Sequence, residues 1–422
     1  MKIPIRLAYR DFLRSFIVMS VEIVLFDRAP WRSNLLPLVA TRPVGNLRVG
    51  ILTLDEKWSR LFQTNSSFLT EDYLQNAFIA PNSQSNEFLV IRADFLPSPE
   101  FVEALTQLKI SEVLVFQNEW LAYRTDRKEF PNAENLLDSF TKVDFEGEVK
   151  RIEHPEHIFL YNAEQIKLDF ELITNARSSK DISATNVVLG NDLFVEENVS
   201  MENCSLNTTS GPIYIGKNAV IEEGSFLKGP IAIGEGSKVK MGSKIYPNVT
   251  VGNGSTIAGE VNNTVIWGDS AKGHDGYLGC AVIGQYCNFG AGSTNSNLRN
   301  DWKTVTLYSY TEQNFRDTHL LKCGMIMGDF SFCGIQSSFT TGTVIGAGVQ
   351  LALLEYVPRF VSDFTWLTNQ KDELYDWQKF VNMLERRGKA TGNFLNEEKT
   401  LILKAVFEQA KENRKEFKST LK

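Results

Sequence analysis

The stretch IGKNAV IEEGSF LKGPIA IGEGSK VKMGSK IYPNVT VGNGST I, residues 215–257, decides the fold, because each block of six begins with an aliphatic residue. These positions are Ile215, Ile221, Leu227, Ile233, Val239, Ile245, Val251 and Ile257. An α-helix repeats every 3.6 residues and a β-strand every 2, so neither produces this period. A six-residue period with frequent glycine is typical of a parallel β-solenoid, in which each block forms one flat side of a triangular coil.

The same period returns further along the chain and accounts for about half of it. It continues at Met327, Cys333, Phe339, Ile345 and Leu351, and extends upstream through Leu189, Val195 and Met201. Since one domain usually holds roughly 100 to 200 residues, a chain of 422 residues predicts two or three domains. We expect an extension over residues 1–18, an α/β domain over 19–184, the solenoid over 185–365 and a helical module over 366–422.

Composition limits the partners and the compartment. A formal charge of −7 and a pI near 5.4 argue against a nucleic-acid partner, which would need a broad basic surface. The five cysteines show no CxxC spacing, which favours a reducing compartment. No apolar run reaches the 18 residues of a membrane span, and the apolar stretch at 12–26 is interrupted by charges. We therefore expect a cytoplasmic protein with small-molecule partners and no membrane contact.

The parts outside the repeat carry ordinary helix and strand patterns. Residues 21–26, 87–91 and 112–117 read as strands and residues 99–108 as a helix, an alternation that favours an α/β domain with a largely parallel sheet. After Pro358 the apolar positions 374, 377, 380, 381 and 384 share a helical face, and Asn396 is a candidate cap for a second helix, whose packing face is predicted at positions 401, 402, 405, 406 and 409. We interpret these helices as packing or oligomer contacts.

The functional information lies where the six-residue period breaks, because its regular positions are core. Between Ile257 and Ile283 the period slips, and this interval contains His274. A polar loop, GAGSTNSNLRNDWK, then replaces the repeat over residues 290–303. Loops carried on a rigid scaffold are common places for binding and catalysis.

His274 has two interpretations. A lone histidine after a glycine is often only a turn residue. Here, however, Asp275, Tyr277, Asn288, Asn297 and Lys303 follow within thirty residues. Together they offer a base, hydroxyl and amide donors and a cation, which is what acylation of an amine on a phosphorylated sugar requires.

The string KGHDGYLGCAVIGQYCNFGAGSTNSNLRNDWK, residues 272–303, resembles the acetyltransferase half of the bifunctional bacterial enzymes that make UDP-N-acetylglucosamine. The family pattern is approximately KxxHLxYLGDxxIGxxxNxGAGTxxxNYDGxxK. The resemblance implies a left-handed β-helix in which His274 is the general base and Tyr277 contacts the sugar phosphate. It further implies that Asn288 and Asn297 contact substrate or acetyl-CoA, Ala291 contacts the acetyl carrier through its main chain, and Lys303 lies near the bound ligands.

Other parts of the family's pattern are kept less closely. Glu260 is retained, whereas Asn262 stands where the family has a phosphate-binding lysine, and Lys238 and Lys240 resemble two family arginines. Lysine attracts phosphate without the bidentate geometry of arginine. An insertion follows Lys303, over residues 304–323, and Ile335 and Leu353 are larger and more apolar than the family's acetyl-CoA contacts.

The N-terminal part, VLFDRAPWRSNLLPLVATRPVGNLRVG, resembles a nucleotidyltransferase that has lost its glycine-rich loop. On this resemblance phosphate would be held by Arg32, Arg42, Arg48 or Lys57. Asp94 follows a predicted strand as the family's metal-binding aspartate does, with Mg²⁺ as the expected ion. A turn or cap residue is an equally good interpretation of Asp94.

Three hypotheses follow. The first is a bifunctional enzyme that acetylates glucosamine 1-phosphate from acetyl-CoA and then transfers uridylyl from UTP, giving UDP-N-acetylglucosamine for the cell envelope. The second keeps only the acyltransferase, with a degenerate nucleotidyltransferase domain. The third is a non-catalytic scaffold that binds a sugar nucleotide. The resemblance also implies a homotrimer.

Overall fold

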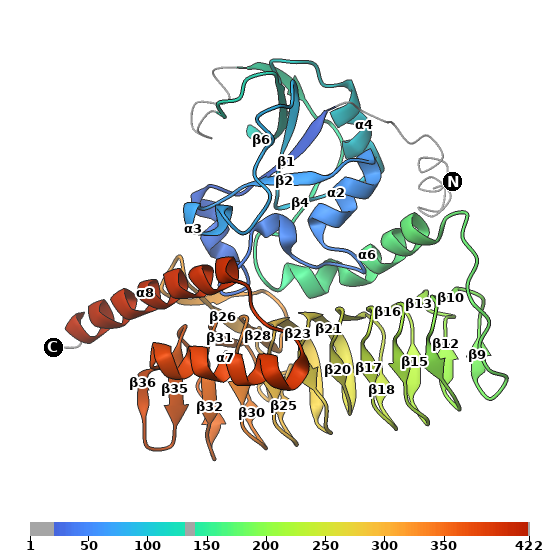
Figure 1. Cartoon of the computed structure of the whole chain (residues 1–422), viewed down its shortest axis with the longest axis vertical. Coiled ribbons are helices and arrows are strands. Elements are labelled where there is room, and N and C mark those ends of the chain that lie inside the picture. Colours follow the sequence, from blue (N-terminus) through green and yellow to red (C-terminus); the bar gives the residue numbers. More distant parts are fainter. Residues whose placement is uncertain (1–20, 131–139, 421–422) are drawn as a thin grey trace.

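The computed structural model describes residues 21–130 and 140–420, and the predicted extension over residues 1–18 lies outside them. An α/β domain, a parallel β-solenoid and two C-terminal helices follow one another, and the N-terminal domain lies along one side of the solenoid (Figure 1). The predicted fold class is confirmed. Among the described residues, no helix is long and apolar enough to cross a membrane.

The N-terminal domain contains a six-stranded sheet of order β2-β1-β3-β6-β5-β7. Only β6 runs against the others, so the expectation of a largely parallel sheet is confirmed. The strands are β1 (Glu22–Phe26), β2 (Ser66–Leu69), β3 (Phe88–Arg92), β5 (Glu112–Phe116), β6 (Glu119–Thr125) and β7 (Thr141–Asp144). A small pair, β4 (Phe95–Leu96) and β8 (Lys150–Arg151), lies beside them.

Helices surround this sheet and connect it to the solenoid. They are the 3₁₀ turns η1 (Pro30–Leu35) and η2 (Val44–Asn46) and the helices α2 (Leu54–Phe62), α3 (Asp72–Gln75), α4 (Pro99–Gln107) and α6 (His157–Thr174). Pro99 and the Ser98 side chain, which accepts from the Phe101 amide, begin α4 as the sequence predicts. Helix α6 lies between the N-terminal sheet and the solenoid (Figure 1).

Face 1 of the solenoid is the side that packs against the N-terminal domain. It consists of β10 (Leu193–Val195), β13 (Ile213–Ile215), β16 (Ile231–Ile233), β19 (Val249–Val251), the second halves of β21 (Glu260–Gly268) and β23 (Tyr277–Gln285), β28 (Met325–Met327), β31 (Thr343–Ile345) and β34 (Phe360–Val361). Because both sides of these strands are buried, they read as apolar runs rather than as alternation. Their outward residues, among them Ala232, Val265, Val282, Ile326 and Val344, belong to the core of the N-terminal domain.

Faces 2 and 3 complete the triangle. Face 2 contains β11 (Ser200–Met201), β14 (Val220–Ile221), β17 (Lys238–Val239), β20 (Thr256–Ile257), β22 (Ala271–Lys272), β24 (Asn288–Phe289), β29 (Phe332–Cys333), β32 (Gln350–Ala352) and β35 (Thr365–Thr368), with β36 (Asp372–Leu374) paired antiparallel at its end. Face 3 contains β9 (Val187–Leu189), β12 (Ser205–Asn207), β15 (Phe226–Lys228), β18 (Lys244–Ile245), the first halves of β21 and β23, β25 (Thr294–Asn295), β30 (Ser338–Phe339) and β33 (Tyr356–Val357).

The six-residue aliphatic positions fill the interior of the prism, as predicted. All eight from Ile215 to Ile257 are at most 2% exposed and form one core with Met327, Cys333, Phe339, Ile345 and Leu351. Leu189 is an exception because it points outward and is 49% exposed. In that first coil Val188, which is itself 37% exposed at the end of the prism, is the residue in register with the interior Leu206.

The insertion over residues 304–323 forms an antiparallel hairpin, β26 (Thr306–Ser309) and β27 (Asn314–Asp317), which reaches the N-terminal domain. Arg316 forms an ion pair of 2.6 Å with Glu156, which is 2% exposed. At the tip, the Thr311 hydroxyl lies 2.8 Å from Asn34 Oδ1 and 3.1 Å from Ser33 Oγ in η1. The hairpin therefore joins the loop at 290–303 to the N-terminal domain.

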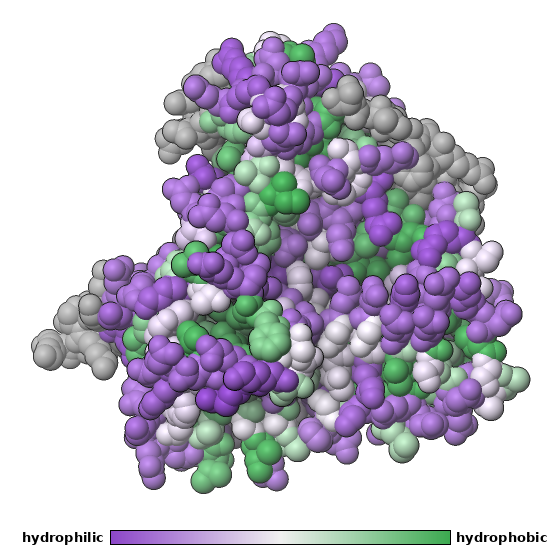
Figure 2. Space-filling view, in the orientation of Figure 1, coloured by the Kyte–Doolittle hydropathy of each residue, from purple (hydrophilic) through white to green (hydrophobic). Residues whose placement is uncertain are grey.

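The C-terminal helices α7 (Trp377–Thr391) and α8 (Glu397–Thr420) bridge the solenoid and the N-terminal domain. Asn396 caps α8, as predicted, by accepting from the Lys399 amide at 3.0 Å. Apolar side chains gather between the two helices (Figure 2), and their buried residues share a core with Leu74 of α3 and with Phe330 and Phe364 of the solenoid.

Candidate active site

The six-residue period breaks because two consecutive coils of the solenoid lack a turn between face 3 and face 1. β21 and β23 are each nine residues long and continue from face 3 to face 1 without an intervening turn. In addition, only Ala258 and Gly259 separate β20 from β21, whereas the four residues 273–276 separate β22 from β23. A short corner of the solenoid therefore lies next to a longer one, and the longer one carries His274.

Close backbone packing holds this longer corner in place. A Cβ on Gly259 would lie 2.7 Å from the Gly276 carbonyl oxygen, and a Cβ on Gly276 would overlap the carbonyl oxygen of Ser293 in the next coil. Both glycines have positive φ angles, +80° and +128°. The turn at 273–276 is thus stacked between the corner at 258–259 and the turn at 290–293.

His274 itself is exposed at this corner. Lys240 lies two coils before His274, and its side chain extends toward the turn: its Cδ would lie 4.0 Å from a Cβ placed on Gly273. Ala291 lies in the turn of the following coil, where its carbonyl accepts from the Gln336 amide at 2.7 Å. The structure therefore brings His274, Lys240 and Ala291 to one edge of the prism.

A second group lies beside it on face 3. Tyr277 stands opposite Glu260 in the ladder between β23 and β21, and Asn297 Nδ2 donates to the Tyr277 hydroxyl at 2.8 Å. Burial raises the pKa of Tyr277, and the nearby Cys280 and Glu260 raise it further. Asn297 also lies 3.4 Å from Cys280 Sγ. The phenol is thus protonated at neutral pH and oriented by a neighbouring amide.

Three of the predicted residues lie further out. Asn288 is exposed on face 2, and Lys238, on the same face, forms a surface ion pair of 3.5 Å with Glu222. Lys303 is exposed in the loop after face 3, where its amide donates to Asp301 Oδ1 at 3.3 Å. Surface lysines such as these lose little free energy when they give up a bound water or a weak ion pair to bind a phosphate.

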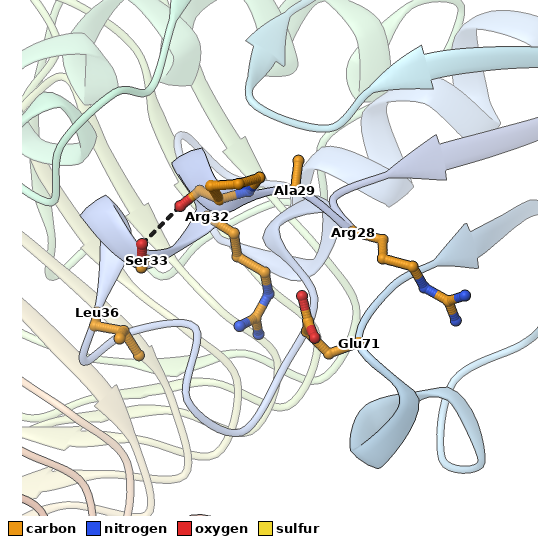
Figure 3. A pocket seen from close by; sticks show the side chains of 7 residues that line it. Arg28, Ala29, Arg32, Ser33, Leu36 and Glu71 are labelled. Atoms are coloured by element: carbon orange, nitrogen blue, oxygen red, sulfur yellow. Dashed lines mark hydrogen bonds between the residues drawn. The ribbon is translucent and has the colours of Figure 1, made fainter. Parts of the chain in front are cut away.

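A cavity of about 380 Å³ lies at the carboxyl ends of β1 and β2 in the N-terminal domain. Arg28, Arg32 and Ser33 line it from the segment that follows β1, and Glu71 lines it from the segment after β2 (Figure 3). Arg28 is partly exposed and pairs at 2.8 Å with the exposed Asp72. Ligands of open α/β sheets bind at such strand ends.

The cations that the sequence predicts as phosphate ligands in this domain are buried in structural contacts. Arg32 pairs with Asp27 at 3.2 Å and donates to the carbonyls of Val39 and Arg42. Arg42 pairs with Asp329 of the solenoid and stacks 3.9 Å from the Trp267 ring. The Arg48 guanidinium donates to the Trp267 carbonyl at 3.0 Å.

Lys57 pairs with Asp169 of α6 and is 1% exposed. Of the predicted phosphate ligands, only Arg32 touches the cavity.

Asp94 does not have the surroundings of a metal ligand. Its side chain is fully buried, and its oxygens accept from Arg92 at 2.8 Å and from Arg151 at 2.7 Å. Within residues 21–130 and 140–420, no group of three His, Cys, Asp or Glu side chains is arranged to hold a metal. The guanidinium groups of Arg92 and Arg151 already bind the carboxylate that Mg²⁺ would need, so Asp94 in this arrangement does not fit the ion.

Two residues of interest were missed by the sequence reasoning. Lys272 is buried beneath the His274 turn, and its position could have been found because it is the sixth residue after Ile266. Arg28 could have been found as well, because it lies two residues after the first strand.

Comparison with known proteins supports the resemblance. Residues 23–178 match the sugar nucleotidyl transferase family. The chain is 32% identical over 115 residues to the bifunctional protein GlmU of Methanocaldococcus jannaschii and 30% identical over 115 residues to that of Methanococcus maripaludis, in each case over 27% of either chain. It is 34% identical over 88 residues to the GlmU of Methanococcus aeolicus, over 21% of either chain.

Each match therefore spans about a quarter of the curated relatives' length or less. Among solved structures, the polySia specific acetyltransferase NeuO aligns with 47% of this chain and 84% of its own at 15% identity and a TM-score of 0.23. Over residues 23–178 the N-terminal domain is thus similar to a family of sugar nucleotidyl transferases.

Proposed function

We propose that the solenoid transfers an acetyl group from acetyl-CoA to the amine of glucosamine 1-phosphate. The observation that carries the proposal is the exposed His274 on a longer corner, with Lys240 and Ala291 on neighbouring coils and the Tyr277–Asn297 pair beside it. The choice of substrates rests on the resemblance of residues 272–303 to the acetyltransferase half of the enzymes that make UDP-N-acetylglucosamine, and the similarity to bifunctional GlmU proteins supports a transferase with two activities.

In this proposal His274 accepts a proton from the substrate ammonium, and the resulting free amine attacks. Its nitrogen forms a bond to the thioester carbonyl carbon, the carbon–sulfur bond breaks, and the leaving thiolate of CoA takes up the second proton that the nitrogen loses. The Tyr277 hydroxyl and the Asn297 amide are placed to donate to the sugar phosphate or to the developing oxyanion. Lys238, Lys240 and Lys303 supply positive charge for phosphates, Glu260 and Asn288 are polar contacts, and Ala291 contacts the acetyl carrier.

The test is release of free thiol from acetyl-CoA in the presence of glucosamine 1-phosphate. We expect His274→Ala to lower kcat by roughly 10²- to 10⁴-fold, which is the usual contribution of a general base. His319→Ala is a matched control, because His319 is also exposed and lies in the hairpin region. Undiminished turnover in His274→Ala would remove the assignment of the base, and no turnover in the wild type would favour the scaffold hypothesis.

We further propose that the N-terminal domain transfers a uridylyl group from UTP to N-acetylglucosamine 1-phosphate. Two observations favour it: the family match over residues 23–178, and the cavity at the strand ends lined by Arg28 and Arg32. Arg42, Lys57 and Asp94 enter this proposal as supports of the domain rather than as ligands, because their charges are paired.

Release of pyrophosphate from UTP, with Mg²⁺ in the buffer, tests this second activity. We expect Arg28→Gln to raise the KM for UTP about tenfold, as loss of one charged hydrogen bond would. Arg127→Gln, an exposed arginine of the same domain, is the control. Absence of pyrophosphate release from the wild type would leave the acyltransferase alone with a degenerate domain.

A homotrimer is part of the proposal, since related solenoids form acetyl-CoA sites between neighbouring prisms. Face 3 supports it, because the described residues leave large side chains such as Phe226 and Tyr356 exposed there, at 59% and 72%. Sedimentation equilibrium measures the assembly, and a monomer at micromolar concentration would contradict it.

A further inference from the structure

Lys272 stands where the six-residue period predicts an aliphatic residue. In the face 2 ladder it lies opposite Ile257, and the pairing of Ala271 with Asn288 places it in register with Phe289. Ile257, Lys272 and Phe289 are 0%, 3% and 4% exposed, so the lysine belongs to the interior column. A charged side chain has replaced an apolar one at a single coil, and this coil is the one that carries His274.

The ammonium of Lys272 lies beneath the turn at 273–276. Nζ donates to the main-chain carbonyl of His274 at 2.8 Å, and a Cβ placed on Gly276 would lie 3.3 Å from the same nitrogen. Asp275, in the same turn, is the carboxylate that acts on it. The side chain therefore starts in the apolar column and ends at the inner side of the turn that presents the imidazole.

Such a lysine does not contribute to stability as an aliphatic residue would. A buried ammonium is costly unless it is fully paired and hydrogen-bonded. Burial lowers the pKa of Lys272 to about 8, against the opposing attraction of Asp275. An isoleucine or valine would complete the column at no such cost, as it does in the coils before it. The position therefore has a role other than core packing.

We propose that Lys272 is a positioning residue for the proposed acyl transfer. By holding the His274 carbonyl from inside, it fixes the backbone of residues 273–276 and with it the direction in which the imidazole projects. The corner is otherwise held by the close contacts of Gly259 and Gly276, which restrict its approach to the neighbouring coils but supply no donor to its inner carbonyl. The inference rests on the acyl-transfer function proposed above.

The first experiment does not depend on activity. In full-length Lys272→Met the donor is lost and the column becomes apolar throughout. We expect amide hydrogen exchange in residues 273–277 to become roughly tenfold faster, which corresponds to one lost hydrogen bond to a charged group. The thermal midpoint should be unchanged or higher. Ile257→Met, in the same column one coil earlier, is the matched control and should leave exchange at 273–277 unchanged.

The second experiment measures kinetics with acetyl-CoA and glucosamine 1-phosphate. We expect Lys272→Met to lower kcat by about 10- to 100-fold with little change in KM, because a displaced base weakens the chemical step more than substrate binding. Lys272→Arg, which keeps a cationic donor, should recover part of the lost kcat. A merely structural lysine would instead lower the thermal midpoint and leave kcat per folded molecule unchanged.

The outcomes separate this inference from the proposed function. If amide exchange at residues 273–277 is as slow in Lys272→Met as in the wild type, the positioning role is overturned, whatever the activity of the variant. Faster exchange together with a wild-type enzyme that acetylates nothing would keep the role of Lys272 in the turn and overturn the acyl-transfer proposal. Faster exchange with unchanged kcat would show that the turn does not position the base.

Discussion

At the scale of single residues, the candidate site depends on two glycines as much as on its polar groups. Gly259 and Gly276 let the backbone of three consecutive coils approach closely at one corner. Other glycines at solenoid corners have positive φ angles in open space; Gly236, at φ +65°, would have no atom within 4 Å of a Cβ placed on it. An alanine at Gly236 would therefore suffer only from backbone strain, whereas an alanine at Gly276 would also clash with its neighbours.

We expect Gly276→Ala to be considerably more destabilising than Gly236→Ala. The control carries only the cost of a left-handed alanine, about 1 kcal/mol, whereas Gly276→Ala also pushes the turn away from Ser293 and should cost about 2 kcal/mol more. Urea unfolding measures both. Equal losses of unfolding free energy would mean that the turn at 273–276 yields freely, which contradicts the stacked corner described above.

At the scale of elements, burial could be predicted where the sequence repeats regularly and less well where it does not. The period of six located the interior column because stacking forces each coil to repeat, and Asn396 was identified as a cap from its residue type. The face of α8 is predicted only in part: Ile402 and Val406 are buried, but Leu401 is 59% exposed, and Leu403 and Phe407, which lie outside the predicted face, are buried. Three adjacent apolar residues, 401–403, left the helical phase undetermined.

The candidate site was predictable only in part. His274, Tyr277 and Asn297 follow from a local motif, since residues 17 to 20 apart stack on consecutive coils of a solenoid. The partners of Arg42 and Lys57 are Asp329 and Asp169, which come from distant segments, and Asp94 has one distant partner, Arg151, besides the nearby Arg92. No local pattern indicates which of these distant charges is already paired in the folded chain, so the sequence alone predicts all three residues as ligands.

The hairpin β26–β27 gives a prediction at the same scale. Arg316→Leu leaves Glu156 buried without its partner and should lower the unfolding free energy by about 3 to 5 kcal/mol. Lys371→Leu breaks an exposed pair with Glu373 and should change it by less than about 1 kcal/mol. Chemical denaturation compares the two; similar small effects would mean that the hairpin does not join the domains firmly.

At the scale of the whole molecule, three parts meet in one polar junction. Gln285 of the solenoid accepts from Arg42 of the N-terminal domain at 3.2 Å and from Lys399 of α8 at 3.0 Å. Gln285 in turn donates to Asp269 at 2.8 Å. The solenoid amide thus links both of the other parts, and the C-terminal helices pack against the solenoid and against α3.

This junction makes stability depend on pH in a defined direction. Burial, together with Arg42, lowers the pKa of Lys399 to about 8 from 10.5, against the attraction of Asp329 and Asp269. Between these pH values the unfolded chain binds more protons, so the contribution of Lys399 to stability rises with pH. Relative to Lys399→Met, the wild type should gain up to about 3 kcal/mol. Denaturant unfolding of both proteins across this range tests it; a constant difference would contradict it.

The apolar outer side of face 1 also bears on how the polypeptide is made. Ala232, Val265, Val282 and Val344 would be exposed to water if the solenoid formed alone. Synthesis starts at the N-terminus, and domains tend to fold as they emerge from the ribosome. The α/β domain and α6 therefore precede every coil they will cover, and each new coil of face 1 can dock onto a surface that is already present. Because of this order along the chain, the apolar side of each new coil can be covered as the coil forms.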